Sequence, residues 1–414
     1  MRQLFWIIGP PIIRADSGFQ TMRVYLDYNA TTPVAPEVLD AMLPYFTHAY
    51  GNASSIHSPG QEARLAVENA RESVASLIGA KSAEIVFTSG GTEADNLAIF
   101  GMVAGAPGKR HVITSAIEHH AVLHACEKLQ SDGVSDGVDV TFLPVSSDGI
   151  VDPEDVRRAL RPETALISVM HANNELGTIQ PIEEIGAIAR EADIYFHTDA
   201  VQTAGKIPID VNSLGVDLLS ISAHKIYGPK GTGALFVKSG TRLEPILFGG
   251  HHERDRRPGT ENVAGIVGMG CASAIAARSV IDTVSRIAVL RDRLENSLLS
   301  AIPQCGVNGR RDMRTANTSN MTFSFAEGES LVIALDLRGV ACSTGAACSS
   351  GAVEPSHVLK SIGLSPEDGR SSVRFSLGRE TSAAEIDFVI DVIPAAVDHL
   401  RELSPAWGKV IPAR

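Results

Sequence analysis

The chain has 414 residues, of which 44% are apolar and 20% charged, and its formal net charge is −12. This is the composition of a globular protein long enough for two domains, and the acidic balance argues against nonspecific nucleic-acid binding. We recognise no apolar run of about 18 residues, so we expect no membrane partner. Five cysteines without a Cys-x-x-Cys pair favour a reducing cytoplasmic compartment over a disulfide framework or a four-cysteine zinc site.

Residues 1–21 differ in texture from the rest of the chain. An apolar stretch at residues 5–8 is broken by two prolines, and no small-residue cleavage site follows it. Met22 then stands just before a strand-like segment at residues 24–26. We therefore expect synthesis to start at Met22, with residues 1–21 forming an N-terminal extension that is disordered or not translated.

Short apolar runs alternate with amphipathic helical segments through the first two thirds of the chain. Helical periodicity is clearest at residues 61–77 and 182–190. Strands are predicted at residues 85–87, 111–114, 140–145, 164–170, 193–198, 218–221 and 233–237. Near-continuous apolar strands separated by helices indicate an α/β fold with a mainly parallel sheet covered by helices on both faces.

The pattern changes near residue 284. Helices are predicted over residues 284–299 and 383–400, whereas residues 321–325 and 373–377 alternate like half-exposed strands. We therefore expect a large domain over residues 35–283 and a smaller α+β domain over residues 284–414. Residues 22–34 are expected to form an N-terminal segment that joins the small domain.

Two neighbouring strands are predicted to end in groups of complementary chemistry. Asp199 follows the strand at residues 193–198, and Lys225 follows the strand at residues 218–221 after a small polar turn. A lysine amine can form a Schiff base with pyridoxal phosphate (PLP), and a carboxylate can pair with the cofactor's pyridinium nitrogen. This pair predicts a PLP site.

A glycine-rich turn at residues 89–92 (Ser-Gly-Gly-Thr) stands between a predicted strand and a predicted helix. Free backbone amides and the helix dipole make such a turn an anion site, although most glycine turns before helices are only turns. Beside a lysine and an aspartate of the kind above, we interpret it as the site of the cofactor phosphate. Ser222 and His224 would add further donors.

His119 and Asn174 follow two further predicted strands. A histidine there can stack on a planar cofactor and exchange protons, and a side-chain amide can donate to the cofactor's phenolate oxygen. Each residue also has an ordinary interpretation. His119 would belong to a surface pair with His120, whose side chain points elsewhere, and Asn174 would serve only the turn.

Residues 342–355 are almost all small, so we expect them to form an exposed loop. Cys348 in this loop is a reachable thiol that can act as a nucleophile. Cys126 and Cys271 fit the commoner pattern of a buried thiol, and a packed, inert side chain is also the favoured interpretation of Cys342. Arg379 can bind a carboxylate bidentately, although a solvated surface arginine is the ordinary alternative.

Taken together, these segments resemble the cysteine desulfurases, a branch of the class-V aminotransferases with the type-I PLP-transferase fold. The resemblance extends from residue 25 to about residue 407. It implies a mainly parallel seven-stranded sheet and a smaller α+β C-terminal domain. The motifs that carry it are Leu26-Asp-Tyr-Asn-Ala-Thr-Thr-Pro, Gly51-Asn-Ala-Ser-Ser-Ile-His, Glu118-His119, Asn173-Asn-Glu-Leu-Gly, His197-Thr-Asp199-Ala-Val-Gln202, His224-Lys225, Arg257-Pro-Gly-Thr260 and the cysteine loop that ends in Glu354-Pro-Ser-His.

The resemblance also implies a role for each matching residue. Lys225 carries the cofactor and moves the substrate's Cα proton, Asp199 pairs with the pyridine nitrogen, and His119 stacks on the ring. The phenolate oxygen is bound by Asn174 and Gln202. The phosphate is held by Gly91, Thr92, Ser222 and His224, and by Thr260 of a neighbouring subunit. The substrate carboxylate is bound by Arg379 with help from Asn52.

The activity that the resemblance implies is conversion of L-cysteine to L-alanine, with the sulfur passed to Cys348 as a persulfide. A sulfur-acceptor protein such as an iron–sulfur scaffold would receive it, and Cys348 would be a transient iron–sulfur ligand. A cytoplasmic homodimer is expected, without a stable nucleic-acid partner. The alternatives are another PLP-dependent aminotransferase or lyase, a selenocysteine lyase, and a non-catalytic scaffold subunit. The Cys348 loop favours the desulfurase, and the intact residue set argues against the scaffold.

Overall fold

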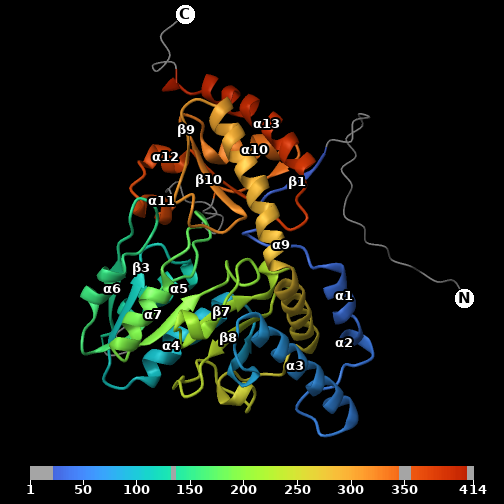
Figure 1. Cartoon of the computed structure of the whole chain (residues 1–414). Helices are drawn as coiled ribbons and strands as arrows, with labels where there is room; N and C mark the ends of the chain where they lie inside the picture. Colours follow the sequence, from blue (N-terminus) through green and yellow to red (C-terminus); the bar gives the residue numbers. More distant parts are fainter. Residues whose placement is uncertain (1–21, 132–136, 345–355, 408–414) are drawn as a thin grey trace, which may run out of the picture.

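The computed structural model describes residues 22–131, 137–344 and 356–407, which form a larger and a smaller lobe (Figure 1). The larger lobe contains a seven-stranded sheet of order β2-β8-β7-β6-β5-β3-β4. β8 is antiparallel to both of its neighbours, and the other pairs are parallel. The strands are β2 (Ile85–Thr88), β3 (His111–Ser115), β4 (Asp139–Leu143), β5 (Thr164–Ser168), β6 (Tyr195–Asp199), β7 (Leu218–Ser222) and β8 (Gly233–Val237).

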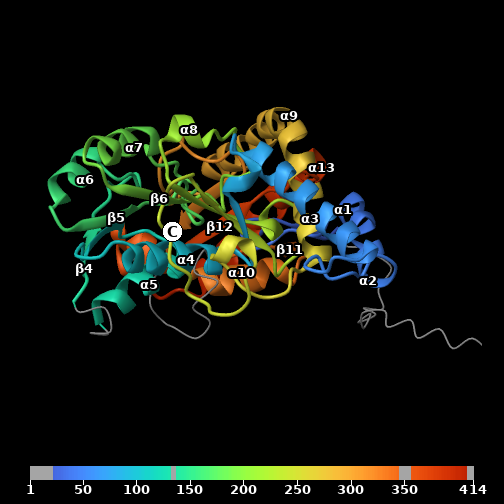
Figure 2. The same ribbon diagram turned by 90° about the horizontal axis from the view of Figure 1, so that it is seen from below.

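Helices cover both faces of this sheet, which confirms the expected fold class. Figure 2 shows α6 (Pro153–Ala159), α7 (Ile182–Glu191) and α8 (Val211–Leu214) on one side. On the other side lie α4 (Gly91–Gly105) and α5 (His120–Ser131). Successive residues of a strand point to opposite faces, so β2 places Ile85 and Phe87 in one hydrophobic cluster and Val86 in another. β2 is therefore buried along its whole length.

The smaller lobe is built on an antiparallel sheet of β9 (Cys305–Val307), β10 (Thr318–Phe323) and β12 (Ser372–Ser376). Its helices are α10 (Gly328–Asp336), α11 (His357–Ser361), α12 (Pro366–Arg370) and α13 (Ala383–Glu402). β1 (Val24–Tyr25) joins this lobe by pairing in parallel with β11 (Val340–Ala341).

The expectation that the two alternating segments of the smaller lobe are half-exposed is wrong. Every residue of β10 and β12 is buried. The polar side chains that suggested exposure are hydrogen-bonded inside the protein: the Thr322 hydroxyl lies 2.8 Å from that of Ser372, and the Ser376 hydroxyl accepts from the Asn29 backbone N at 2.9 Å. Burial of polar groups is tolerated where each finds a partner.

Helix α9 (Val263–Ala301) connects the lobes and starts 21 residues before the helix predicted at residue 284. It packs on α3 (Ser58–Leu77) and α1 (Pro36–Met42), which precedes α2 (Pro44–Thr47), and then on α13. Gly270 permits the close approach to α3, because a Cβ there would lie 2.6 Å from Ala70. The expected domain boundary at residues 283–284 falls inside this helix, and the domain limits stay a prediction.

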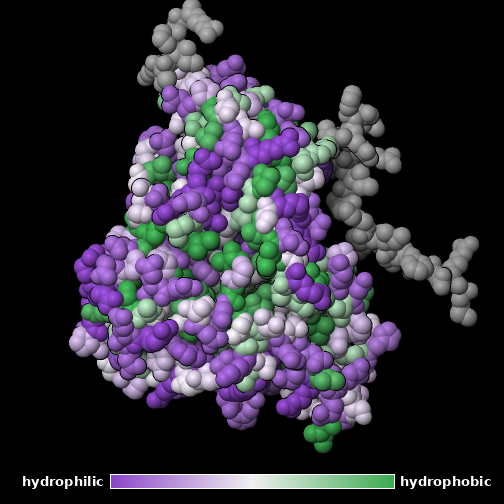
Figure 3. Space-filling model, in the orientation of Figure 1, coloured by the Kyte–Doolittle hydropathy of each residue, from purple (hydrophilic) through white to green (hydrophobic). Residues whose placement is uncertain are grey.

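By length and composition alone α9 could cross a membrane, although Arg278 interrupts its apolar run before the expected minimum of about 18 residues is reached. A buried core helix passes the same test, and 44% of the apolar window of α9 is buried inside the protein. Hydrophobic side chains lie along α9 and at the waist between the lobes on the face shown in Figure 3.

A buried ion pair in the smaller lobe offers a test of the packing. The carboxylate of Glu295 in α9 contacts both terminal nitrogens of Arg314, at 2.5 and 2.7 Å, and both side chains are almost fully buried. Glu295→Ala leaves the guanidinium buried without its partner, so we expect a loss of about 3–5 kcal/mol in the free energy of unfolding. Urea denaturation followed by circular dichroism measures this loss. Glu191→Ala, which removes an exposed partner of Arg157, is the control and should change little.

Candidate active site

The site is built at one edge of the large sheet, where the carboxyl ends of several strands meet. β3, β5, β6 and β7 run parallel, and β2 runs in the same direction because β8 is antiparallel to both β2 and β7. Asp199 is the last residue of β6, and Lys225 ends the short 3-10 helix η2 (Ala223–Lys225) that follows β7. Strand ends from distant parts of the sequence thus meet at one edge of the sheet. Open α/β sheets bind their ligands at this edge.

The Lys225 side chain is held by the N-terminal segment. Its Nζ donates to the backbone carbonyl oxygens of Asn29 at 2.5 Å and Ala30 at 2.7 Å. The turn that carries the lysine is fixed by the same segment, because Thr32 donates through both its backbone N and its hydroxyl group to the carbonyl of His224. The amine is therefore presented to the waist between the lobes rather than to bulk solvent.

Asp199 lies in a buried cluster of carboxyl groups. Burial raises its pKa to about 6, against the lowering effects of the hydrogen bond from the Val201 backbone N at 2.8 Å and of the Lys225 charge. Burial likewise raises the pKa of Glu118 to about 8, and burial and then Asp199 raise the pKa of Asp95 well above its usual value. A cationic group, such as a protonated pyridinium nitrogen, would be stabilised beside these buried carboxyl groups.

The imidazole of His119 is neutral near physiological pH. Burial, and next the Lys225 charge, lower its pKa to about 4. Its Nδ1 accepts a hydrogen bond from the Ala121 backbone N at 3.1 Å, so the ring proton of the neutral form lies on Nε2. A neutral ring with a fixed tautomer can stack on a flat cofactor and donate one hydrogen bond.

One cavity of the site lies at the N-terminus of α4. It is lined by Thr31, residues 89–93, Ser222, His224, Lys230 and Gly231. The carboxylate of Glu93 is engaged elsewhere: Oε2 accepts from the Ser89 backbone N at 2.8 Å, and Oε1 pairs with Arg257 at 2.8 Å. The remaining groups are backbone amides, hydroxyl groups, an imidazole and an ammonium, which together fit a phosphate.

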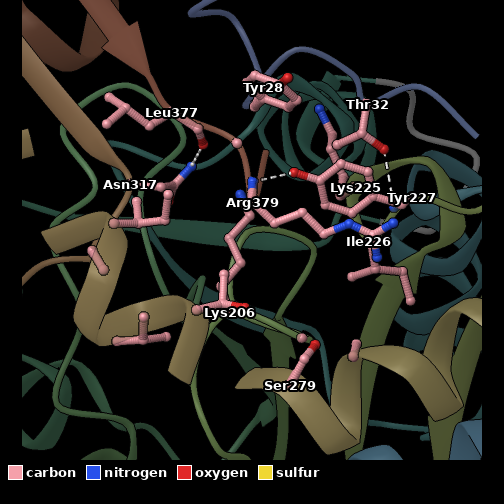
Figure 4. A pocket seen from close by; sticks show the side chains of 17 residues that line it. Tyr28, Thr32, Lys206, Lys225, Ile226, Tyr227, Ser279, Asn317, Leu377 and Arg379 are labelled. Atoms are coloured by element: carbon pink, nitrogen blue, oxygen red, sulfur yellow. Dashed lines mark hydrogen bonds between the residues drawn. The ribbon is translucent and has the colours of Figure 1, made fainter. Parts of the chain in front are cut away.

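Figure 4 shows another pocket, which is lined in part by Lys225. The guanidinium of Arg379 lies over the ring of Tyr227, 4.3 Å from its centre, and the Arg379 backbone N donates to the Tyr227 hydroxyl at 2.6 Å. Lys206 and Asn317 line the same pocket. The structure thus places Arg379 in one pocket with the lysine that would carry the cofactor.

Two other predicted residues lie apart from these cavities. Asn52 and Thr260 are exposed, and neither is among the residues that line the cavities described above. The side chain of Asn52 caps a turn by accepting from the Ser54 backbone N at 2.9 Å. Within one chain the two residues do not join the site.

The sequence did not single out Arg374 as a site residue, although it stands five positions before Arg379. It is buried, pairs with Asp27 at 2.7 Å, and donates to the backbone carbonyl of Asn174 at 3.0 Å. Its Nε is buried without a hydrogen-bond partner. A charged residue inside a strand whose neighbours are apolar was the signal that could have found it.

Cys348 lies outside the described residues. Cys342 and Cys126, two thiols that were expected to be packed, are buried, and desolvation raises the pKa of each to about 12. The inert interpretation of these two side chains therefore agrees with their surroundings. In the described part of the chain, no group of three or more His, Cys, Asp or Glu side chains could hold a metal ion.

The electrostatic account of His119 can be tested in the cofactor-free protein. Because the Lys225 ammonium adds to the effect of burial, Lys225→Ala should raise the pKa of His119, while burial keeps it below the ordinary value of about 6.5. NMR titration of histidine labelled at Cε1 measures both proteins, and His119→Gln assigns the signal. A pKa at or above the ordinary value in the unaltered protein would contradict the account.

Comparison with known proteins agrees with this geometry. The class-V aminotransferase model matches residues 24–389. The chain is 51% identical to a cysteine desulfurase IscS of Dictyoglomus turgidum over 92% of this chain and 96% of that protein, and 50% identical to one of Methanosarcina thermophila over 94% and 96%. A solved NifS-like protein superposes with a TM-score of 0.85 at 35% identity, covering 91% of this chain and 100% of the other. A structure described as SspA in complex with cysteine superposes with a TM-score of 0.75 at 38% identity, covering 87% and 100%.

This family works with PLP, and the buried carboxyl cluster and the cavity at the N-terminus of α4, with its backbone amides and hydroxyl groups, fit that cofactor. The chain belongs to the class-V aminotransferases and, among them, to the cysteine desulfurases.

Proposed function

We propose that the protein converts L-cysteine to L-alanine and takes up the sulfur on Cys348. In this reaction the Cβ–Sγ bond of the substrate breaks, a proton replaces sulfur on Cβ, and a sulfur–sulfur bond forms on Cys348. The thiol of Cys348 becomes a persulfide, so oxidation at sulfur balances reduction at carbon. A thiol reductant or an acceptor protein then releases the sulfur.

One observation carries this proposal: the identity of about 50% to enzymes named cysteine desulfurases extends over more than nine tenths of both chains. The lysine and aspartate alone would fit any aminotransferase of this fold. The structural relative in complex with cysteine supports the same substrate class.

The chain's own residues have distinct tasks in this reaction. When bound, PLP supplies an aldehyde for the substrate amine and a ring that withdraws electrons from it. Lys225 holds the cofactor and afterwards moves the Cα proton with its Nζ. Asp199 supplies the negative charge that keeps the ring nitrogen protonated, and neutral His119 stacks on the ring. Asn174 and Gln202 donate to the phenolate oxygen.

The phosphate would be held by Gly91, Thr92, Ser222 and His224, and by Thr260 of a second copy in a homodimer.

Large apolar side chains are exposed in the N-terminal part of the chain and in the segment that precedes Thr260. Contact with a second copy in a homodimer would bury them. They include Phe46, Tyr50, Ile56 and Phe248, which are between 60% and 93% exposed.

Downstream, we propose that the persulfide goes to an acceptor protein such as an iron–sulfur scaffold in the cytoplasm. In that exchange Cys348 would be a transient ligand of the cluster. The relatives named IscS support an iron–sulfur scaffold as the acceptor.

The role of Cys348 predicts a separation of cofactor binding from sulfur release. Cys348→Ser should abolish sulfide production from L-cysteine and leave the visible absorbance of bound PLP unchanged, because the hydroxyl group cannot accept the substrate sulfur. Sulfide is measured with a thiol reductant present, and Cys342→Ser, which alters a packed thiol, is the control. Undiminished sulfide release by the Cys348→Ser variant would contradict the role, and transfer of the amino group to a 2-oxo acid would indicate a transaminase.

The two arginines make a second prediction. If Arg379 binds the substrate carboxylate, Arg379→Ala should raise KM for L-cysteine about 10- to 100-fold, the effect expected from losing a charge-assisted hydrogen bond. Steady-state kinetics at saturating PLP measures KM and kcat. An unchanged KM in this variant, together with an increase in Arg374→Lys, would transfer the role to the buried arginine.

A further inference from the structure

A second lysine, Lys206, lies in the pocket of Lys225 (Figure 4). It follows β6 by a few residues, four positions after Gln202. Its Nζ donates to Oε1 of Gln202 at 2.9 Å and to Oδ1 of Asn29 at 3.1 Å. Both contacts are with side-chain amide oxygens of residues in the site. They hold the Lys206 amine there, although the residue is partly exposed.

These contacts determine which way the Gln202 amide faces. A lysine side chain has only donors, so the atom that Gln202 turns toward Lys206 must be its oxygen. The NH2 group then faces the other way, where it donates to the carbonyl oxygen of Asn29 at 3.1 Å. Lys225 donates to that same oxygen, so the Gln202 NH2 group and the cofactor-carrying amine are neighbours.

Asn29 is oriented by the same logic. Its Oδ1 accepts from Lys206 and from Asn317 Nδ2 at 2.9 Å, which turns its own Nδ2 toward the hydroxyl of Thr318 at 2.8 Å. The contact with Asn29 thus holds the Lys206 amine in place while it donates to Gln202.

The electrostatic surroundings show that Lys206 is held against a cost. Burial, and then the charges of Lys225 and Arg374, lower its pKa to about 7. Arg379, Tyr227 and Tyr28 are the other titratable groups that line the pocket. Because Lys206 lies beside two further cations, its hydrogen bonds to the two amide oxygens are the favourable contacts that hold its amine in place.

We propose that Lys206 is a positioning residue of the cofactor site, which orients the Gln202 amide so that its NH2 group faces the phenolate oxygen of PLP. The proposal rests on the contact between Gln202 and that oxygen in the proposed function. Without Lys206 the amide can rotate, and the phenolate loses a donor. A less stabilised phenolate holds the proton of its Schiff base more tightly. Removal of the neighbouring Lys206 charge acts in the same direction.

The test is a pH titration of the visible absorbance of the PLP-loaded protein without L-cysteine. In Lys206→Met we expect the midpoint to rise by about one pH unit, a tenfold change in proton affinity. Lys206→Arg keeps a donor and a charge and should lie close to the unaltered protein. Lys238→Met removes an exposed lysine that pairs with Asp217 outside this pocket, and is the matched control.

A double-mutant cycle separates positioning from a simple charge effect. If Lys206 acts through Gln202, Lys206→Met should shift the midpoint much less in a Gln202→Leu background than alone. An unchanged midpoint in Lys206→Met, or shifts that add fully, would overturn the proposal. If Lys206→Met does not retain PLP, Lys206→Gln takes its place, with a smaller shift of the same sign expected. Because no L-cysteine is present, failure of the desulfurase proposal would leave these spectra unaffected.

Discussion

The site depends on one buried asparagine that joins the two lobes. The backbone N of Asn29 donates to the Ser376 hydroxyl and its Nδ2 to the Thr318 hydroxyl, both in the smaller lobe. Its backbone carbonyl accepts from Gln202 and Lys225 in the larger lobe. All four polar atoms of the residue are used, since Oδ1 also accepts hydrogen bonds. A buried polar network of this kind fixes one arrangement, because any shift leaves groups without partners.

Charge is distributed unevenly around this asparagine. Asp199 and Glu118 lie deep under the strand ends, where burial raises the pKa of both carboxyl groups. Lys225, Lys206 and Arg374 lie nearer the small lobe, and their charges lower the pKa of Lys206. A cofactor with a cationic ring nitrogen at one end and anionic oxygens on its other substituents matches this separation.

Parts of this account could be predicted from sequence because they depend on local pattern. Asp199 and Lys225 each follow an apolar strand, and parallel strands bring such ends together. Lys206 and Asn29 were missed because their role comes from contacts between segments more than 170 residues apart, which no local pattern records. Arg374 was missed because alternation in β12 suggested a half-exposed strand, whereas both faces are covered. The long α9 was divided because its small residues gave no clear helical face before residue 284.

The central claim is that this constellation desulfurates cysteine. The most direct measurement is to incubate the PLP-loaded protein with L-cysteine and an excess of thiol reductant, and to quantify alanine and sulfide in the same samples. The account predicts equimolar amounts that increase together over many turnovers. Bound PLP with no alanine, or alanine formed without sulfide, would contradict it and assign the fold to a different reaction.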